Sequence, residues 1–173
     1  GTGNIPSFTA VNTGVSPVTA IITVTAVYTN AGITCTGNSQ SFTIVVNPTP
    51  TVNPVANQVL CNGSNTAAVN FTGSVPGTIY NWTNNNTSIG LAAAGAGNIA
   101  SFVATNATNV AQTATITVTP NFSNTVTCAG TPITFTITVN PIPTVNPVAN
   151  QTVCAGTTVT QAFTGTVAGT VYS

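Results

Sequence analysis

The 173-residue sequence contains no lysine, arginine, aspartate, glutamate or histidine. General acid–base catalysis needs a side chain whose pKa can be tuned towards the working pH, and these residues are its usual suppliers. Serine and threonine are abundant, but a hydroxyl becomes a nucleophile only beside a base. We therefore predict that the chain is not an enzyme.

The same absence excludes several kinds of partner. Nucleic-acid binding requires basic groups that neutralise phosphates, and calcium or magnesium sites depend on carboxylates. The four cysteines, Cys35, Cys61, Cys128 and Cys154, lack the close CxxC spacing of zinc sites. No metal, cofactor or nucleic acid is expected. Apolar stretches such as residues 91–97 are far shorter than the roughly 20 residues that a membrane-spanning helix needs, so no membrane insertion is expected.

What is present favours a folded chain, because 42% of the residues are apolar and disorder goes with low hydrophobicity and high net charge. The sequence starts without methionine and carries no signal peptide. We interpret it as an internal segment of a longer protein.

Internal repetition is the strongest positive signal. Three segments return 93, 94 and 92 residues later with few changes. They are residues 51–58 returning as 144–151, residues 1–8 as 95–102, and residues 71–80 as 163–172. The repeating unit is therefore about 93 residues long.

This period divides the chain into the C-terminal part of a first repeat (1–50), a complete second repeat (51–143) and the N-terminal part of a third (144–173). Proline-rich connectors at residues 46–54 and 139–147 mark the joins. Proline fixes φ and withholds a hydrogen-bond donor, so short, stiff, extended connectors and a rod-like array are predicted.

Within the second repeat the hydrophobic pattern has a period of two. Residues 113–119 and 133–139 alternate β-branched or aromatic side chains with threonine, which is typical of strands with one buried face. Residues 67–71, 78–82 and 99–103 indicate further strands. About seven short strands in each repeat predict an all-β fold of tandem immunoglobulin-like β-sandwiches.

The aromatic residues allow two interpretations. Tyr80 and Trp82 lie on the same side of one predicted strand and could stack on a carbohydrate. A buried tryptophan in the third strand is the commoner use in sandwiches. We therefore predict that Tyr80 and Trp82 lie in the core, together with Phe71, Phe102 and Phe135.

The cysteines follow the repeat, since Cys128 lies 93 residues after Cys35 and Cys154 lies 93 residues after Cys61. In a secreted array, two cysteines per repeat imply one disulfide per repeat. The favoured pair is Cys61 with Cys128 inside the second repeat, which leaves Cys35 and Cys154 to partners outside these residues. The alternative pairs Cys35 with Cys61 and Cys128 with Cys154 across the connectors.

Residues 151–156 (QTVCAG), residues 128–141 (CAGTPITFTITVNP) and the proline-rich joins give a family resemblance. The sequence resembles the PKD-like repeats of giant Bacteroidota cell-surface adhesins, the SprB-type gliding-motility adhesins exported by type IX secretion. That resemblance implies a filament exported across the outer membrane, displayed at the cell surface, and served by secretion and gliding machinery. Residues 80–86 read YNWTNNN where PKD domains carry WDFGDG, so an acid-dependent calcium role is not expected here.

Three functions remain open for such an array. The repeats could be a structural stalk that contacts neighbouring repeats of the same chain and supports surface attachment. They could themselves bind polysaccharide or surfaces, although exposed aromatics for that role are few. They could also pair with other filament subunits into a self-assembling fibre or sheath, because uncharged strand edges lack the usual protection against edge pairing.

Overall fold

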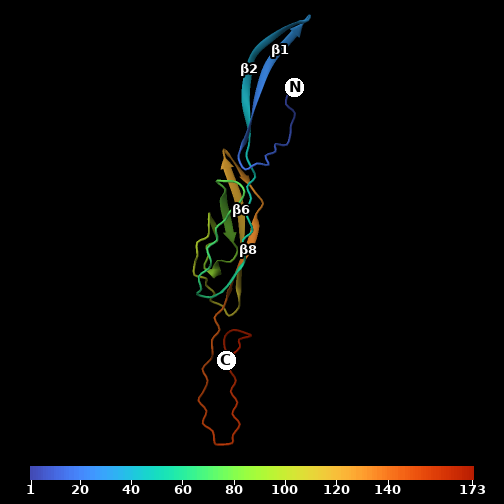
Figure 1. Cartoon of the computed structure of the whole chain (residues 1–173). Helices are drawn as coiled ribbons and strands as arrows, with labels where there is room; N and C mark the ends of the chain where they lie inside the picture. Colours follow the sequence, from blue (N-terminus) through green and yellow to red (C-terminus); the bar gives the residue numbers. More distant parts are fainter.

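The structure is a computed structural model that describes residues 1–173. Three parts follow one another along an extended rod (Figure 1). A hairpin of β1 (Val18–Asn30) and β2 (Ile33–Val46) lies at one end, a compact central unit follows, and the C-terminal residues lie beyond it. All regular structure except one short 3-10 turn is β-strand, which confirms the predicted all-β fold.

The central unit is built on one six-stranded sheet. Its strands pair in the order β3-β8-β6-β4-β5, β7 also pairs with β6, and only the β3–β8 pair is parallel. The elements are β3 (Gln58–Cys61), β4 (Ile79–Asn84), η1 (Thr87–Ile89), β5 (Ala94–Ala96), β6 (Gln112–Asn124), β7 (Val126–Ala129) and β8 (Ile133–Asn140). No helix here has the length and hydropathy to cross a membrane.

Apolar residues at every second position explain why the sheet has one buried face and one exposed face. In β6 the side chains of Ala114, Ile116 and Val118 are fully buried, while the intervening threonines face outward and are partly exposed. β8 alternates in the same way, with Phe135 and Ile137 inside. The predicted strands 113–119 and 133–139 are therefore parts of the two longest strands of this sheet.

A second, less regular layer covers the buried face of the sheet. It consists of extended segments joined by two isolated bridges, Val69 with Ile99 and Asn65 with Val103. The predicted strands 67–71 and 99–103 are thus single bridges and not full ladders. Val52, Val69, Phe71, Ile99 and Ala104 from this layer join the core cluster of 15 residues. The two layers form a β-sandwich of immunoglobulin-like type.

One proline accounts for a difference between the first and second repeats. β2 is continuous over 14 residues, whereas the corresponding stretch of the second repeat is broken into β7 and β8. Ser39 pairs with Thr25 inside β2, but the corresponding residue 93 positions later is Pro132. Proline has no N–H to donate to a ladder, so the strand breaks there.

Candidate functional site

The thiols are the only groups of the chain with the chemistry of metal ligands or redox centres, and they lie far apart. No three ligand-type side chains come together, and all four cysteines are free. In the strand ladders, Cys61 lies opposite Asn140 at one end of the sheet, and Cys128 lies opposite Phe122 at the other end. Between those ends β6 runs from Gln112, opposite Val139, to Phe122, about 33 Å at roughly 3.3 Å per residue.

The predicted disulfide between Cys61 and Cys128 is therefore wrong for this fold, since bridged Cα atoms lie within about 7 Å. The alternative pairs, Cys35 with Cys61 and Cys128 with Cys154, are not formed either. Cys35 lies opposite Tyr28 next to the tip of the β1–β2 hairpin, whereas Cys61 lies opposite Asn140 in the central sheet, so the length of the hairpin separates Cys35 from that sheet. The repeat period indicates which cysteines belong to the same repeat, but the direction of the strands decides which residues meet.

The five aromatic residues that were assigned to the core lie in or against it. Phe71, Tyr80, Trp82 and Phe135 are buried, and Phe102 is partly buried against the same cluster. The rings of Phe71 and Tyr80 lie 5.7 Å apart between centroids, and those of Phe71 and Phe135 lie 6.5 Å apart. Burial raises the pKa of the Tyr80 hydroxyl above its ordinary value of 10.0. These rings present no open platform for a sugar.

Trp82 is held in place by side-chain packing, and its indole nitrogen makes no hydrogen bond. It pairs with Gly95 across the β4–β5 ladder, and its indole lies directly on that glycine. The indole Nε1 is buried without a partner. An unpaired buried donor costs about 1–3 kcal/mol, which the packing of the large ring must offset.

Hydrogen bonds of two asparagine side chains, Asn47 and Asn124, join the first repeat to the central unit. The Asn47 side-chain nitrogen donates to the backbone carbonyls of Asn124 (3.0 Å) and Val126 (3.1 Å), which flank the β6–β7 turn. The Asn124 side chain donates back to Asn47 Oδ1 at 3.3 Å. Asn47, which directly follows β2 of the first repeat, is thereby fixed to the second.

The connector after Asn47 packs into the central unit. Pro48 and Pro50 are fully buried. The carbonyl of Pro50 lies directly against Gly130, where any side chain would overlap it. The prolines were predicted to make a stiff, extended connector; the structure adds that they are core residues, because Gly130 leaves room for them.

The C-terminal residues repeat the geometry of the second repeat. Asn146 donates its backbone N–H to Thr164 at 2.8 Å, as Asn53 does to Thr72 at 2.8 Å. The side-chain amides of both asparagines also donate to the threonine hydroxyls, each at 2.9 Å. Residues 143–173 therefore hold the same local contacts as the second repeat without belonging to a strand ladder.

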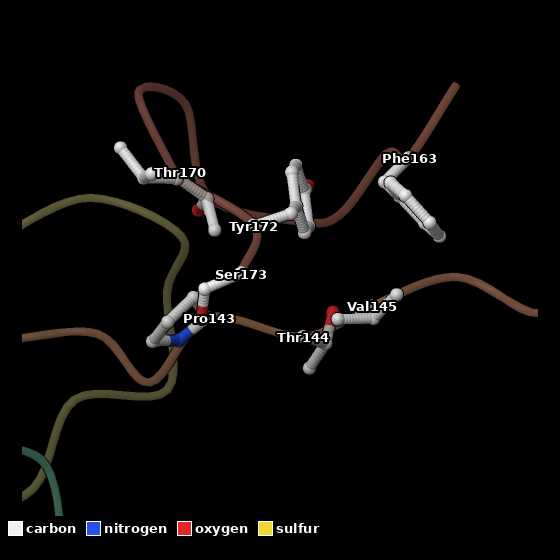
Figure 2. Close-up of a pocket in the computed structure, with 8 residues that line it drawn as sticks. Pro143, Thr144, Val145, Phe163, Thr170, Tyr172 and Ser173 are labelled. Atoms are coloured by element: carbon white, nitrogen blue, oxygen red, sulfur yellow. The ribbon is translucent and has the colours of Figure 1, made fainter. Parts of the chain in front are cut away.

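A hollow with a volume of about 340 Å³ lies in this C-terminal part. Figure 2 shows its two walls, with Pro143, Thr144 and Val145 on one segment and Phe163 and Tyr172 on the other. The ring centroids of Phe163 and Tyr172 are 6.0 Å apart, close to the 5.7 Å of Phe71 and Tyr80.

This hollow corresponds to a surface that is covered in the second repeat. Phe71, the counterpart of Phe163, lies under Phe135 and is 7% exposed, whereas Phe163 is 49% exposed. Pro50, the counterpart of Pro143, lies under Gly130. The hollow is a core face without its covering strands, which accounts for its apolar lining.

Sequence reasoning missed both the Asn47 contacts and the Gly130 contact. The signal was present in the repeated Val-Asn-Pro of residues 46–48 and 139–141, and in the glycine that recurs at 37 and 130. A residue needed for contact between repeats must recur with the repeat. Asparagine and glycine are so frequent here that recurrence alone did not single these out.

Comparison with known proteins gives one match. No curated protein and no solved structure matches the chain. The family model of the PKD-like domain matches residues 58–143, the segment that holds the six-stranded sheet and nearly all of the core. The central unit of this chain thus matches the PKD-like domain family, as the sequence resemblance led us to expect.

Proposed function

We propose that the chain is a non-catalytic structural part of a long extracellular adhesin filament, which supports surface attachment and gliding motility. The observation that carries this proposal is the junction at Asn47, where buried prolines and reciprocal amide contacts fix one repeat to the next. A spacer must transmit position and force from unit to unit, and a fixed junction does so. PKD-like domains are typically extracellular and non-catalytic, which agrees with this role.

The stiffness of the junction is tested by small-angle X-ray scattering of the purified chain. Each of β1 and β6 spans 13 residues, about 43 Å at roughly 3.3 Å per residue. If the hairpin, the central unit and the C-terminal part lie in line and each has about this length, the expected maximum dimension is about 130 Å. A broad distribution with a much shorter mean dimension would contradict a rigid spacer.

Asn47→Ala is the variant that addresses the junction directly. It removes all three amide contacts, and we expect a more bent ensemble and a loss of about 1–2 kcal/mol in stability. Asn70→Ala is the matched control, because Asn70 is exposed on the surface of the same unit. Equal scattering from the two variants would remove the assigned role of Asn47.

Direct binding of polysaccharide or surfaces by the repeats is the second candidate function. The burial of Tyr80 and Trp82 argues against it, because the one aromatic pair that was considered for stacking on a sugar lies in the core. Purified chain is tested for binding to glass, hydrophobic surfaces and glycan arrays. No binding is the result expected of a spacer, whereas saturable glycan binding would favour the second function.

A further inference from the structure

The outer face of the central sheet carries threonine at every outward position of the β6–β8 ladder. The buried residues of both strands lie between these threonines, on the side of the core. Two more threonines, one later in β6 and one in β4, extend the face. We call the eight residues together the threonine face: Thr83, Thr113, Thr115, Thr117, Thr119, Thr134, Thr136 and Thr138. The face lies wholly inside the complete second repeat.

The strand register arranges these side chains as a regular array. Side chains directly opposite each other in an antiparallel ladder lie about 5 Å apart, and those two residues apart on one strand lie about 6.8 Å apart. All but Thr83 lie on the adjacent strands β6 and β8, so a single step of sheet twist acts between them. Three pairs of the array are directly opposite: Thr113 with Thr138, Thr115 with Thr136, and Thr117 with Thr134.

Most of the hydroxyl groups of the threonine face are free to bond outside the chain. The hydroxyls of Thr113 and Thr138 bond to each other at 2.9 Å. The other six make no hydrogen bond to a protein group, although all eight residues are exposed or partly exposed. The sheet therefore presents rows of methyl groups and available hydroxyls to whatever lies against it.

The first repeat shows that the fold does not require this array. The corresponding face of its hairpin is interrupted by Ile21 and Val45, at positions where the second repeat has threonine. Its hydroxyls also bond to one another across the ladder, as in the 2.8 Å contact of Thr23 with Ser41. An uninterrupted array with free hydroxyls is thus a property of the second repeat and not of β-strand formation as such.

We propose that the threonine face binds ice. Ice presents water oxygens that repeat in two directions at distances similar to those between the threonines. Hydroxyl groups in such an array take the place of lattice waters, and the methyl groups between them order the water that they contact. A charged side chain would hold a hydration shell of its own, and the chain has none.

A periodic partner fits this face better than a dissolved one. Soluble partners are held by a few large anchors, above all aromatic side chains and arginine, in well-packed pockets, and the threonine face has no such anchor. Many equivalent weak contacts add up only against a surface that repeats as they do. Ice suits single hydroxyls because each lattice point is one water molecule, whereas a polysaccharide presents whole sugar rings. This activity goes beyond the proposed spacer function, which is tested independently at Asn47.

The purified full chain is tested by nanolitre osmometry of single ice crystals. We expect faceted crystals and a freezing temperature below the melting temperature. Thr117→Lys should lose both effects, because the strongly hydrated ammonium group projects from the middle of the array. Asn70→Lys is the matched control, since it adds the same charge at an exposed residue outside the sheet and should act like the unmodified chain.

Thr117→Val provides a second, milder variant. Valine keeps the β-branched shape and a high preference for strands but removes the hydroxyl, so the sheet should form as before. We expect a partial loss of the difference between freezing and melting temperatures. Circular dichroism melts that match the unmodified chain show that each variant is folded.

The possible results either support the proposal or overturn it. Ice shaping that Thr117→Lys abolishes and Asn70→Lys retains supports it. An unmodified chain that leaves ice crystals round and their freezing temperature unchanged overturns it, and so does equal activity of the two lysine variants. Sedimentation with microcrystalline cellulose is measured in parallel. Binding to cellulose that depends on Thr117, without any effect on ice, would overturn the proposal and assign the threonine face to a crystalline polysaccharide.

Discussion

The Gly130→Ala substitution places one methyl group where the connector between repeats enters the core. The added Cβ would overlap the Pro50 carbonyl oxygen, with the Pro50 carbonyl carbon at 2.9 Å and Pro120 Cγ at 3.0 Å. All three are backbone or ring atoms, so no side-chain rotation relieves the overlap. Overpacking of a core costs about 1–3 kcal/mol, and here the connector must also leave the site where Pro48 and Pro50 are buried.

We therefore expect Gly130→Ala to lose about 2–3 kcal/mol. For a unit of this size each kcal/mol lowers the melting temperature by about 4–8 °C, so thermal denaturation followed by circular dichroism should show a drop of about 10–20 °C. Gly37→Ala is the control, because it makes the same substitution at the corresponding residue of the first repeat, where an added Cβ finds room. Equal melting temperatures for the two variants would refute the packing of the connector against Gly130.

Four further predictions concern the dependence of stability on pH, the core and the thiols. Without acidic, basic or histidine side chains, the unfolding midpoint should be nearly constant from roughly pH 3 to 9. Above about pH 10 stability should fall, because burial raises the pKa of Tyr80 and the unfolded chain loses that proton first; melts of Tyr80→Phe should fall less. Gly95→Ala should cost about 1–3 kcal/mol and shift the fluorescence of Trp82, because the new Cβ would lie 2.6 Å from Cε2 of the indole. Mild oxidation of the monomer should yield no peptide that links Cys61 to Cys128, and mapping such a peptide would contradict the strand register.

The fold was largely predictable because the sequence is repetitive and alternates simply. β-branched residues and threonine alternate through residues 113–119, and this pattern specifies a strand with one buried face whatever surrounds it. The break between β7 and β8 could also have been predicted, because Pro132 stands where the first repeat has Ser39, a residue paired inside β2. The recurring aromatic residues indicated where the core would lie.

The contacts between distant segments were not predictable in the same way. Cys61 and Cys128 were paired because both lie in the second repeat, but the parallel β3–β8 ladder carries Cys61 to the end of the sheet opposite Cys128. Residues 67–71 read as a strand, but they form only one bridge because the facing layer is irregular. The alternation of apolar residues and threonine indicates which side chains of a segment are buried. The register and direction of a strand depend on partner strands that lie elsewhere in the sequence.

The parallel β3–β8 pair has a mechanical consequence. The chain enters the central unit at Pro48, beside the β6–β7 turn, and leaves it after Asn140 at the other end. Tension along the rod therefore pulls β3 and β8 past each other along their own length. Hydrogen bonds in a parallel ladder loaded this way share the force and must break together, whereas a ladder pulled open from one end breaks bond by bond. The unit is thus built to resist stretching along the direction in which its neighbours are attached.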